Sequence, residues 1–101
     1  MQIITAEELK ARIDAGEQLH LVDVREPDEH AVFNIGGILL PVGRVQNMQV
    51  DEIEELKEKE VICYCRSGKR SAQACLVLDT LGFTDTRNLE GGMLGWQEKY
   101  H

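Results

Sequence analysis

The chain has 101 residues, of which 43% are hydrophobic and 29% charged, the size and balance of one globular domain over residues 1–101. Its 18 acidic and 11 basic residues give a net charge of -7, which argues against binding to nucleic acids or anionic membrane surfaces. The longest nearly apolar stretch, residues 35–43, is far shorter than the roughly 20 residues that span a bilayer. The N-terminus carries no export signal, and an odd count of three cysteines fits a reducing compartment, so we expect a cytoplasmic protein.

The first half of the chain alternates between predicted helix and strand. Thr5 opens a capping-box pattern that predicts a helix over about residues 6–15. A short apolar run over residues 19–24 predicts a buried strand that leads into a polar loop at residues 25–28. Residues 38–40, between two glycines and a proline, indicate another short strand.

Residues 49–59 show an amphipathic pattern. Val50, Ile53 and Leu56 recur among many charged residues, which predicts a helix with one apolar face. The acidic residues precede the lysines, an order that suits the helix dipole. We therefore interpret the acidic run as a solvated face and assign it no function.

The second half of the chain continues the alternation. An apolar run over residues 61–65 predicts a buried strand, and helical spacing resumes over residues 72–81. A short strand is expected near residues 86–89, followed by a helix that carries Met93, Trp96 and Tyr100. Strands that alternate with helices imply an α/β fold with a mostly parallel sheet covered on both faces.

Cys65 ends the predicted strand over residues 61–65, at the sheet edge where parallel α/β folds bind ligands. Three of the 11 basic residues lie among the six positions that follow it. These candidate binding residues are Arg66, Ser67, Gly68, Lys69, Arg70 and Ser71. A thiol at a helix N-terminus beside cations should have a lowered pKa and act as a nucleophile. Gly68 lets the loop curl so that its N–H groups form an anion-binding nest over the sulfur.

The other two cysteines and the three histidines suggest neither a second nucleophile nor a metal site. Cys63 lies within a strand pattern and Cys75 on an apolar helix face, so we expect both to be buried and inert. The C-x-C spacing and the absence of a histidine ligand pair argue against a zinc site, and we expect neither a metal nor a cofactor. His30 is the candidate for a distant histidine partner of Cys65.

Three stretches of the chain, in order and with family spacing, resemble the signatures of rhodanese-like domains: residues 23–30, residues 65–71, and residues 89–93 with Trp96. The resemblance covers essentially the whole chain. It implies a small domain with a central, mostly parallel five-stranded sheet flanked by helices on both faces. One segment departs from the family, because Phe-Asn-Ile-Gly-Gly at residues 33–37 replaces the usual Gly-His-Ile-Pro-Gly.

The resemblance also implies roles for single residues. Cys65 matches the position that carries a persulfide, and residues 66–71 match the loop whose amides and cations hold sulfur anions. Asp23 and Arg25 match positions that we interpret as structural, tying loops together by ion pairing.

The implied activity is ping-pong sulfur transfer through Cys65. The donor would be thiosulfate or a persulfide, and the acceptor cyanide or a thiol, including that of a thioredoxin-like or other sulfur-carrier protein. One alternative is a non-catalytic or sulfur-relay module that binds a protein partner. Another is a related phosphatase or arsenate reductase, but the four residues between Cys65 and Arg70 make a loop one residue shorter than the phosphatase loop.

Overall fold

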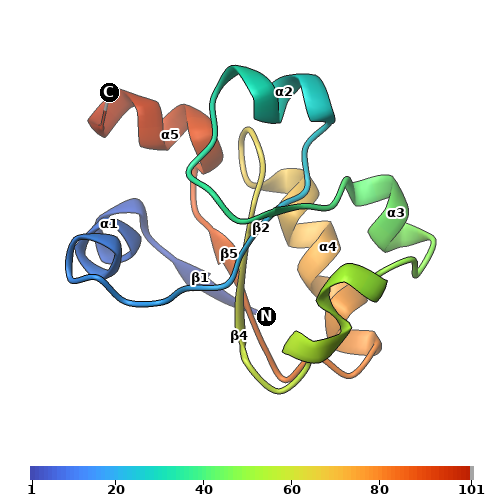
Figure 1. The fold of residues 1–101 in the computed structure, drawn as a ribbon. Helices are drawn as coiled ribbons and strands as arrows, with labels where there is room; N and C mark the ends of the chain where they lie inside the picture. The colour runs from blue at the N-terminus through green and yellow to red at the C-terminus, as the bar shows by residue number, and fades with distance from the viewer. Residues whose placement is uncertain (101) are drawn as a thin grey trace.

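The computed structural model describes residues 1–100, in which five strands form one sheet (Figure 1). The strands are β1 (Gln2–Ile4), β2 (Leu21–Asp23), β3 (Ile38–Leu39), β4 (Glu60–Tyr64) and β5 (Asp85–Leu89). Their order is β1-β5-β4-β2-β3, and every neighbouring pair is parallel. This confirms the predicted five-stranded parallel sheet and places β4, which leads to Cys65, at its centre.

Helices cover both faces of the sheet, as predicted. The helices are α1 (Ala6–Asp14), α2 (Pro27–Val32), α3 (Val42–Gln46), α4 (Lys69–Thr80) and α5 (Gly92–Lys99). One core cluster joins α1 and α5 to the face of β4 that carries Tyr64. The other joins α3 and α4 to the face that carries Cys63. Cys63 and Tyr64 belong to different clusters because successive side chains of a strand point to opposite faces of the sheet.

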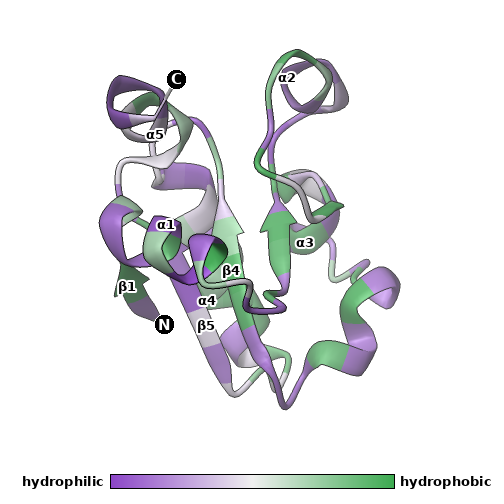
Figure 2. Cartoon of the chain, turned by 60° about the vertical axis from the view of Figure 1, so that its left-hand side comes forward, coloured by the Kyte–Doolittle hydropathy of each residue, from purple (hydrophilic) through white to green (hydrophobic). Residues whose placement is uncertain are grey.

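The carboxyl ends of β2 and β4 point toward the end of the molecule where α2 and α5 lie (Figure 1). Figure 2 also shows hydrophobic residues concentrated in the central strands such as β4. Helix α2 has no buried residue, and it lies beyond the ends of the strands and not on a face of the sheet (Figure 1). Across residues 1–100, no helix is both long and apolar enough to cross a membrane.

The predicted helix over residues 6–15 is confirmed, with reciprocal 3.1 Å hydrogen bonds between Thr5 and Glu8 that complete its capping box. The amphipathic helix predicted over residues 49–59 is confirmed only in part. That segment contains a 3₁₀ helix at Asp51–Leu56. The spacing of three between Val50, Ile53 and Leu56 is the period of a 3₁₀ helix, so all three can face the core from this tighter turn.

Other boundaries also differ from the predictions. Residues 25–28 are not simply a loop, because α2 already begins at Pro27, a residue suited to the first turn of a helix. Helix α4 begins at Lys69, three residues earlier than predicted, and Tyr100 follows the last residue of α5. Strand β1 and helix α3, both of which are short, were not predicted.

Candidate active site

Cys65 lies at the centre of a ring of hydrogen-bond donors. It directly follows β4, and its residue is only 1% exposed. The backbone N–H groups of Gly68 and Ser71 donate to Sγ at 3.1 and 3.4 Å, and the Ser71 hydroxyl lies 3.3 Å from the same atom. These amides point at the sulfur because α4 starts within the loop, where the first N–H groups of a helix have no partner inside it.

This ring changes the acidity of the thiol. Burial raises the pKa of Cys65, but hydrogen bonds from the Ser71 hydroxyl and from the amides of Ser71, Gly68 and Ser67 outweigh burial and lower it. The direction agrees with the sequence prediction. The main groups responsible are hydrogen-bond donors, whereas the prediction also gave weight to nearby cations. The site therefore favours a thiolate, the nucleophilic form of cysteine.

Gly68, within the loop, and Asn88, outside it, hold the shape of the loop. Gly68 precedes α4 with a φ of +100°, a left-handed conformation that favours glycine. The buried Asn88 of β5 donates from Nδ2 to the Gly68 carbonyl at 3.0 Å, and its Oδ1 lies 2.5 Å from the Ser71 hydroxyl, whose one proton is shared between Asn88 and the Cys65 sulfur. Asn88 was not predicted as a site residue, because four of the five residues of β5 are polar and nothing in the sequence distinguishes it from its neighbours.

The start of α5 supports the loop from the other side. The N–H groups of Met93 and Leu94 donate to the carbonyls of Cys65 and Arg66 at 2.9 and 3.0 Å. Gly92 has a φ of +56°, and a Cβ atom there would lie 2.5 Å from each of those carbonyl oxygens. Glycine is required at this position so that α5 can approach the loop backbone closely.

The three cations of the loop have different surroundings. Arg70 makes a bidentate ion pair with Glu29 of α2, with N–O distances of 2.8 and 2.9 Å. Arg66 and Lys69 are exposed, and neither makes an ion pair with any of residues 1–100. Ser67 is also exposed. Two of the three predicted cations therefore remain available to an anion, and the third is neutralised by a residue that sequence analysis did not select.

The buried Asp23 organises the segment between β2 and α2. Arg25 donates to Asp23 from Nη2 at 2.8 Å and to the Phe33 carbonyl at 2.6 Å, as the structural interpretation of this pair predicted. The His30 Nδ1 atom lies 2.8 Å from the Asp23 carboxylate, and the hydrogen bonds given to Cys65 come from other residues. Burial raises the pKa of Asp23, but its contacts with Arg25 and His30 lower it below the ordinary value. His30 thus belongs to this tie and does not pair with Cys65.

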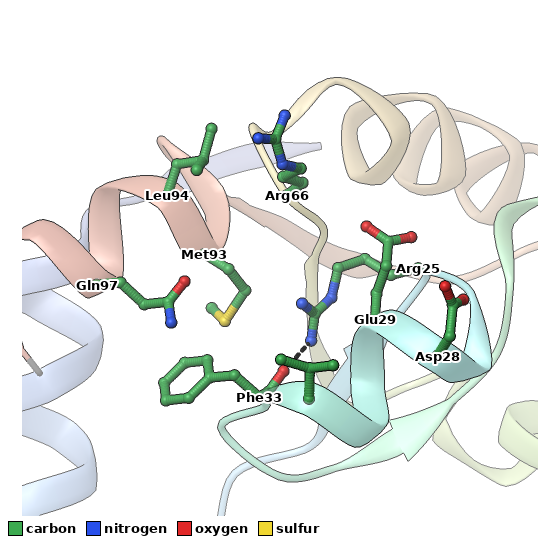
Figure 3. A pocket seen from close by; sticks show the side chains of 9 residues that line it. Arg25, Asp28, Glu29, Phe33, Arg66, Met93, Leu94 and Gln97 are labelled. Carbon is green, nitrogen blue, oxygen red and sulfur yellow. Dashed lines mark hydrogen bonds between the residues drawn. The ribbon is translucent and has the colours of Figure 1, made fainter.

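A pocket of about 280 Å³ opens between α2 and α5, next to the loop (Figure 3). Figure 3 shows Arg66 above it, with Met93 and Phe33 on its wall. The lining residues are Arg25, Asp28, Glu29, Val32, Phe33, Arg66, Met93, Leu94 and Gln97. Two of the lining residues are linked to Cys65. Arg66 follows it in the chain, and the Met93 N–H donates to the Cys65 carbonyl oxygen.

Cys63 and Cys75 are buried and unbridged, as the sequence indicated. Among residues 1–100, no group of three or more histidine, cysteine or acidic side chains is arranged to hold a metal ion. The arrangement around Cys65 offers a thiolate held by hydrogen-bond donors.

Comparisons with known proteins show which family the chain resembles. The rhodanese-like domain family matches residues 5–99. A putative sulfurtransferase of Bacillus subtilis, YtwF, is 40% identical over 93% of this chain and 88% of its own length. YrkF of the same organism, named a putative sulfur carrier protein, is 34% identical over 95% of this chain, which spans about half (51%) of that relative. The solved structure of a human single-domain sulfurtransferase is 28% identical, with a TM-score of 0.82 and coverage of 100% of this chain and 99% of that one.

Proposed function

Because the chain belongs to the rhodanese-like domain family, we propose that it is a sulfurtransferase that carries sulfane sulfur as a persulfide on Cys65. The observation that supports this most directly is the ring of donors from Gly68 and Ser71 around Sγ. Such a ring stabilises a thiolate before the reaction and a persulfide anion after it. We take residues 1–101 as one catalytic domain.

The reaction has two displacements. The Cys65 thiolate attacks the outer sulfur of the donor, the S–S bond of thiosulfate breaks, and sulfite leaves with the bonding electron pair. The acceptor, a thiolate or cyanide, then attacks the outer sulfur of the persulfide. The Cys65 thiolate leaves with the electrons of that S–S bond, so the enzyme returns to its starting state.

The loop of residues 66–71 forms the donor site in this proposal, with the Arg70 side chain paired to Glu29. Arg66 and Lys69 attract the negative charge of the donor, since they are exposed and unpaired among the described residues. The amides of Ser67, Gly68 and Ser71 hold the negative sulfur. Charge-assisted hydrogen bonds of this kind are stronger than neutral ones, particularly where water is excluded.

The partners follow from this chemistry. The donor is a small sulfur compound, either thiosulfate or a persulfide. The acceptor is a small thiol or a protein thiol, such as that of a thioredoxin-like or sulfur-carrier protein, and the relative named as a sulfur carrier supports the second kind. Three unbridged thiols fit a reducing compartment such as the cytoplasm.

Intact-mass measurement tests the proposal directly. We expect thiosulfate to add one sulfur atom to the protein and cyanide to remove it, with thiocyanate as the product. Absence of the sulfur adduct would contradict the proposal and favour a non-catalytic binding module. An adduct that small acceptors discharge slowly, and a protein thiol discharges fast, would identify a sulfur relay.

A further inference from the structure

We propose that Glu29 sets the donor preference of this site by neutralising Arg70, so that donors of low negative charge, such as organic persulfides and thiosulfonates, are favoured over the thiosulfate dianion. This inference rests on the sulfurtransferase function proposed above. It makes Glu29 a specificity-determining residue, although it belongs to α2 and not to the loop that holds Cys65.

The Glu29 carboxylate is fixed by three hydrogen bonds. Its Oε1 atom accepts from Arg70 Nη1 at 2.8 Å and from the Glu26 backbone N–H at 3.1 Å, and its Oε2 accepts from Arg70 Nη2 at 2.9 Å. Bidentate pairing of this kind holds both planar groups in one orientation. The Arg70 guanidinium is therefore directed at α2 and is not free to receive an anion at the loop.

The pair adds no net charge to the site. Its contact with Arg70 lowers the pKa of Glu29 to about 2, so the carboxylate stays ionised throughout the pH range of ordinary assays. A neutral pair attracts an anion far less than a free guanidinium would. Asp28, which also lines the pocket, adds a negative charge to the same wall. A dianion that approaches from this side is opposed by α2 and attracted mainly by Arg66 and Lys69.

The pocket can stabilise an organic donor through apolar contacts. Apolar side chains from α5 and from the end of α2 line it: Val32, Phe33, Met93 and Leu94. Val32 is 87% exposed and Leu94 45% exposed, so an apolar group placed against them would remove hydrocarbon surface from water. An organic persulfide or thiosulfonate gains this contact, and thiosulfate, which has no apolar part, does not.

The variant Glu29→Gln separates charge from shape. Glutamine keeps an oxygen that can accept from the Glu26 N–H, but it leaves the Arg70 charge uncompensated. We expect the KM for thiosulfate to fall about fivefold, and the KM for the monoanion benzenethiosulfonate to fall about twofold, because the electrostatic energy scales with the charge of the donor. The double variant Glu29→Gln/Arg70→Gln, which restores a neutral pair, should return the KM for thiosulfate close to that of the wild type.

A matched control is Glu52→Gln, which removes a carboxylate from the exposed pair with Arg44, outside the pocket. It should leave the KM for both donors unchanged. An unchanged or raised KM for thiosulfate in Glu29→Gln would overturn the inference, since Glu29 would then act only as a support for the loop.

Alkylation of Cys65 provides a readout that does not depend on sulfur transfer. Iodoacetate is an anion and iodoacetamide is a neutral molecule of similar shape, so the ratio of their rates reports the electrostatic potential at Sγ. Glu29→Gln should raise the iodoacetate-to-iodoacetamide ratio about threefold, and an unchanged ratio would contradict the inference. If wild-type protein formed no persulfide, the proposed function would fail while this ratio still tested the role of Glu29.

Discussion

Cys63 and Cys65 lie two residues apart at the carboxyl end of the same strand, and they differ in acidity although both are buried. Their residues are 0% and 1% exposed, and both belong to the same hydrophobic cluster. Contact with Cys75, together with burial, raises the pKa of Cys63 well above its ordinary value. Burial also opposes ionisation of Cys65, but donors from Ser71 and Gly68 outweigh it.

The comparison shows that exposure does not determine which of the two thiols has the lower pKa. Cys63 faces helix α4 at its middle, where the backbone N–H groups are already bonded within the helix. Cys65 faces the start of α4, where the backbone N–H groups have no partner within the helix and donate to the sulfur instead. A shift of two residues along β4 therefore moves a thiol from an apolar site to a site that stabilises negative charge.

The largest expected effect comes from removing the Cys65 thiol. Cys65→Ser should abolish both turnover and the sulfur adduct, because a serine hydroxyl is not ionised near neutral pH and forms no persulfide. Steady-state assays with thiosulfate and cyanide, together with intact mass, measure this. Cys75→Ser is the matched control and should keep activity. If it lost activity while Cys65→Ser kept it, the nucleophile would be misassigned.

The donor ring itself is tested by Ser71→Ala. The one proton of the Ser71 hydroxyl is shared between Cys65 Sγ at 3.3 Å and Asn88 Oδ1 at 2.5 Å, so its loss weakens the donor ring and should raise the pKa of Cys65. The alkylation rate rises with pH as the thiolate forms, so the whole profile should move to higher pH. At a pH below the wild-type pKa, the rate should fall about tenfold, as expected for one hydrogen bond to a charged group.

The rate of iodoacetamide alkylation as a function of pH measures this shift. Thr80→Ala is a suitable control, because its hydroxyl bonds a carbonyl within α4, away from the sulfur. A profile in Ser71→Ala that coincides with the wild type would mean that the backbone amides alone lower the pKa.

The exposed loop cations should influence capture of the donor and not the acidity of the thiol. Replacing Arg66 or Lys69 with alanine should raise the KM for thiosulfate roughly tenfold each, about 1.4 kcal/mol. Cys65 should remain open to alkylation in both variants. Added salt should reproduce part of the effect by screening. Kinetics at two ionic strengths measure this, and an unchanged KM in both variants would assign donor binding to the amides alone.

The sequence was sufficient to predict the parallel sheet and the position of Cys65, because both depend on local patterns. A buried strand such as β4 is an apolar run in the sequence, and the loop of residues 66–71 comes soon after that strand. The short element α3 was missed because five residues give too few periodic positions to count. The type of the helix expected over residues 49–59 was not predicted, because a spacing of three fits two kinds of helix.

The contacts that shape the site could not be predicted in the same way. Asn88 lies 17 residues beyond Ser71, and Glu29 lies 41 residues before Arg70, so only the folded chain brings these partners together. The sequence does not show which of the three loop cations has an acidic partner. The position of α2 distinguishes Arg70 from Arg66 and Lys69, and no local pattern in the loop records that position.

The smallest effect on activity should come from Cys63, and it completes the comparison between the two thiols. Cys63→Ala removes a fully buried sulfur from the core and should lower the free energy of unfolding by about 1 kcal/mol, because the cavity left behind is only partly filled. Urea unfolding measures this loss. The kcat/KM for thiosulfate should stay within about twofold of the wild type, since a core change of this size is local. In wild-type protein, Cys65 should be alkylated while Cys63 remains unmodified, as peptide mass mapping would show. Alkylation of Cys63 at a comparable rate, or a large loss of activity in Cys63→Ala, would mean that the two positions are not separated by the donors of α4 in the way proposed.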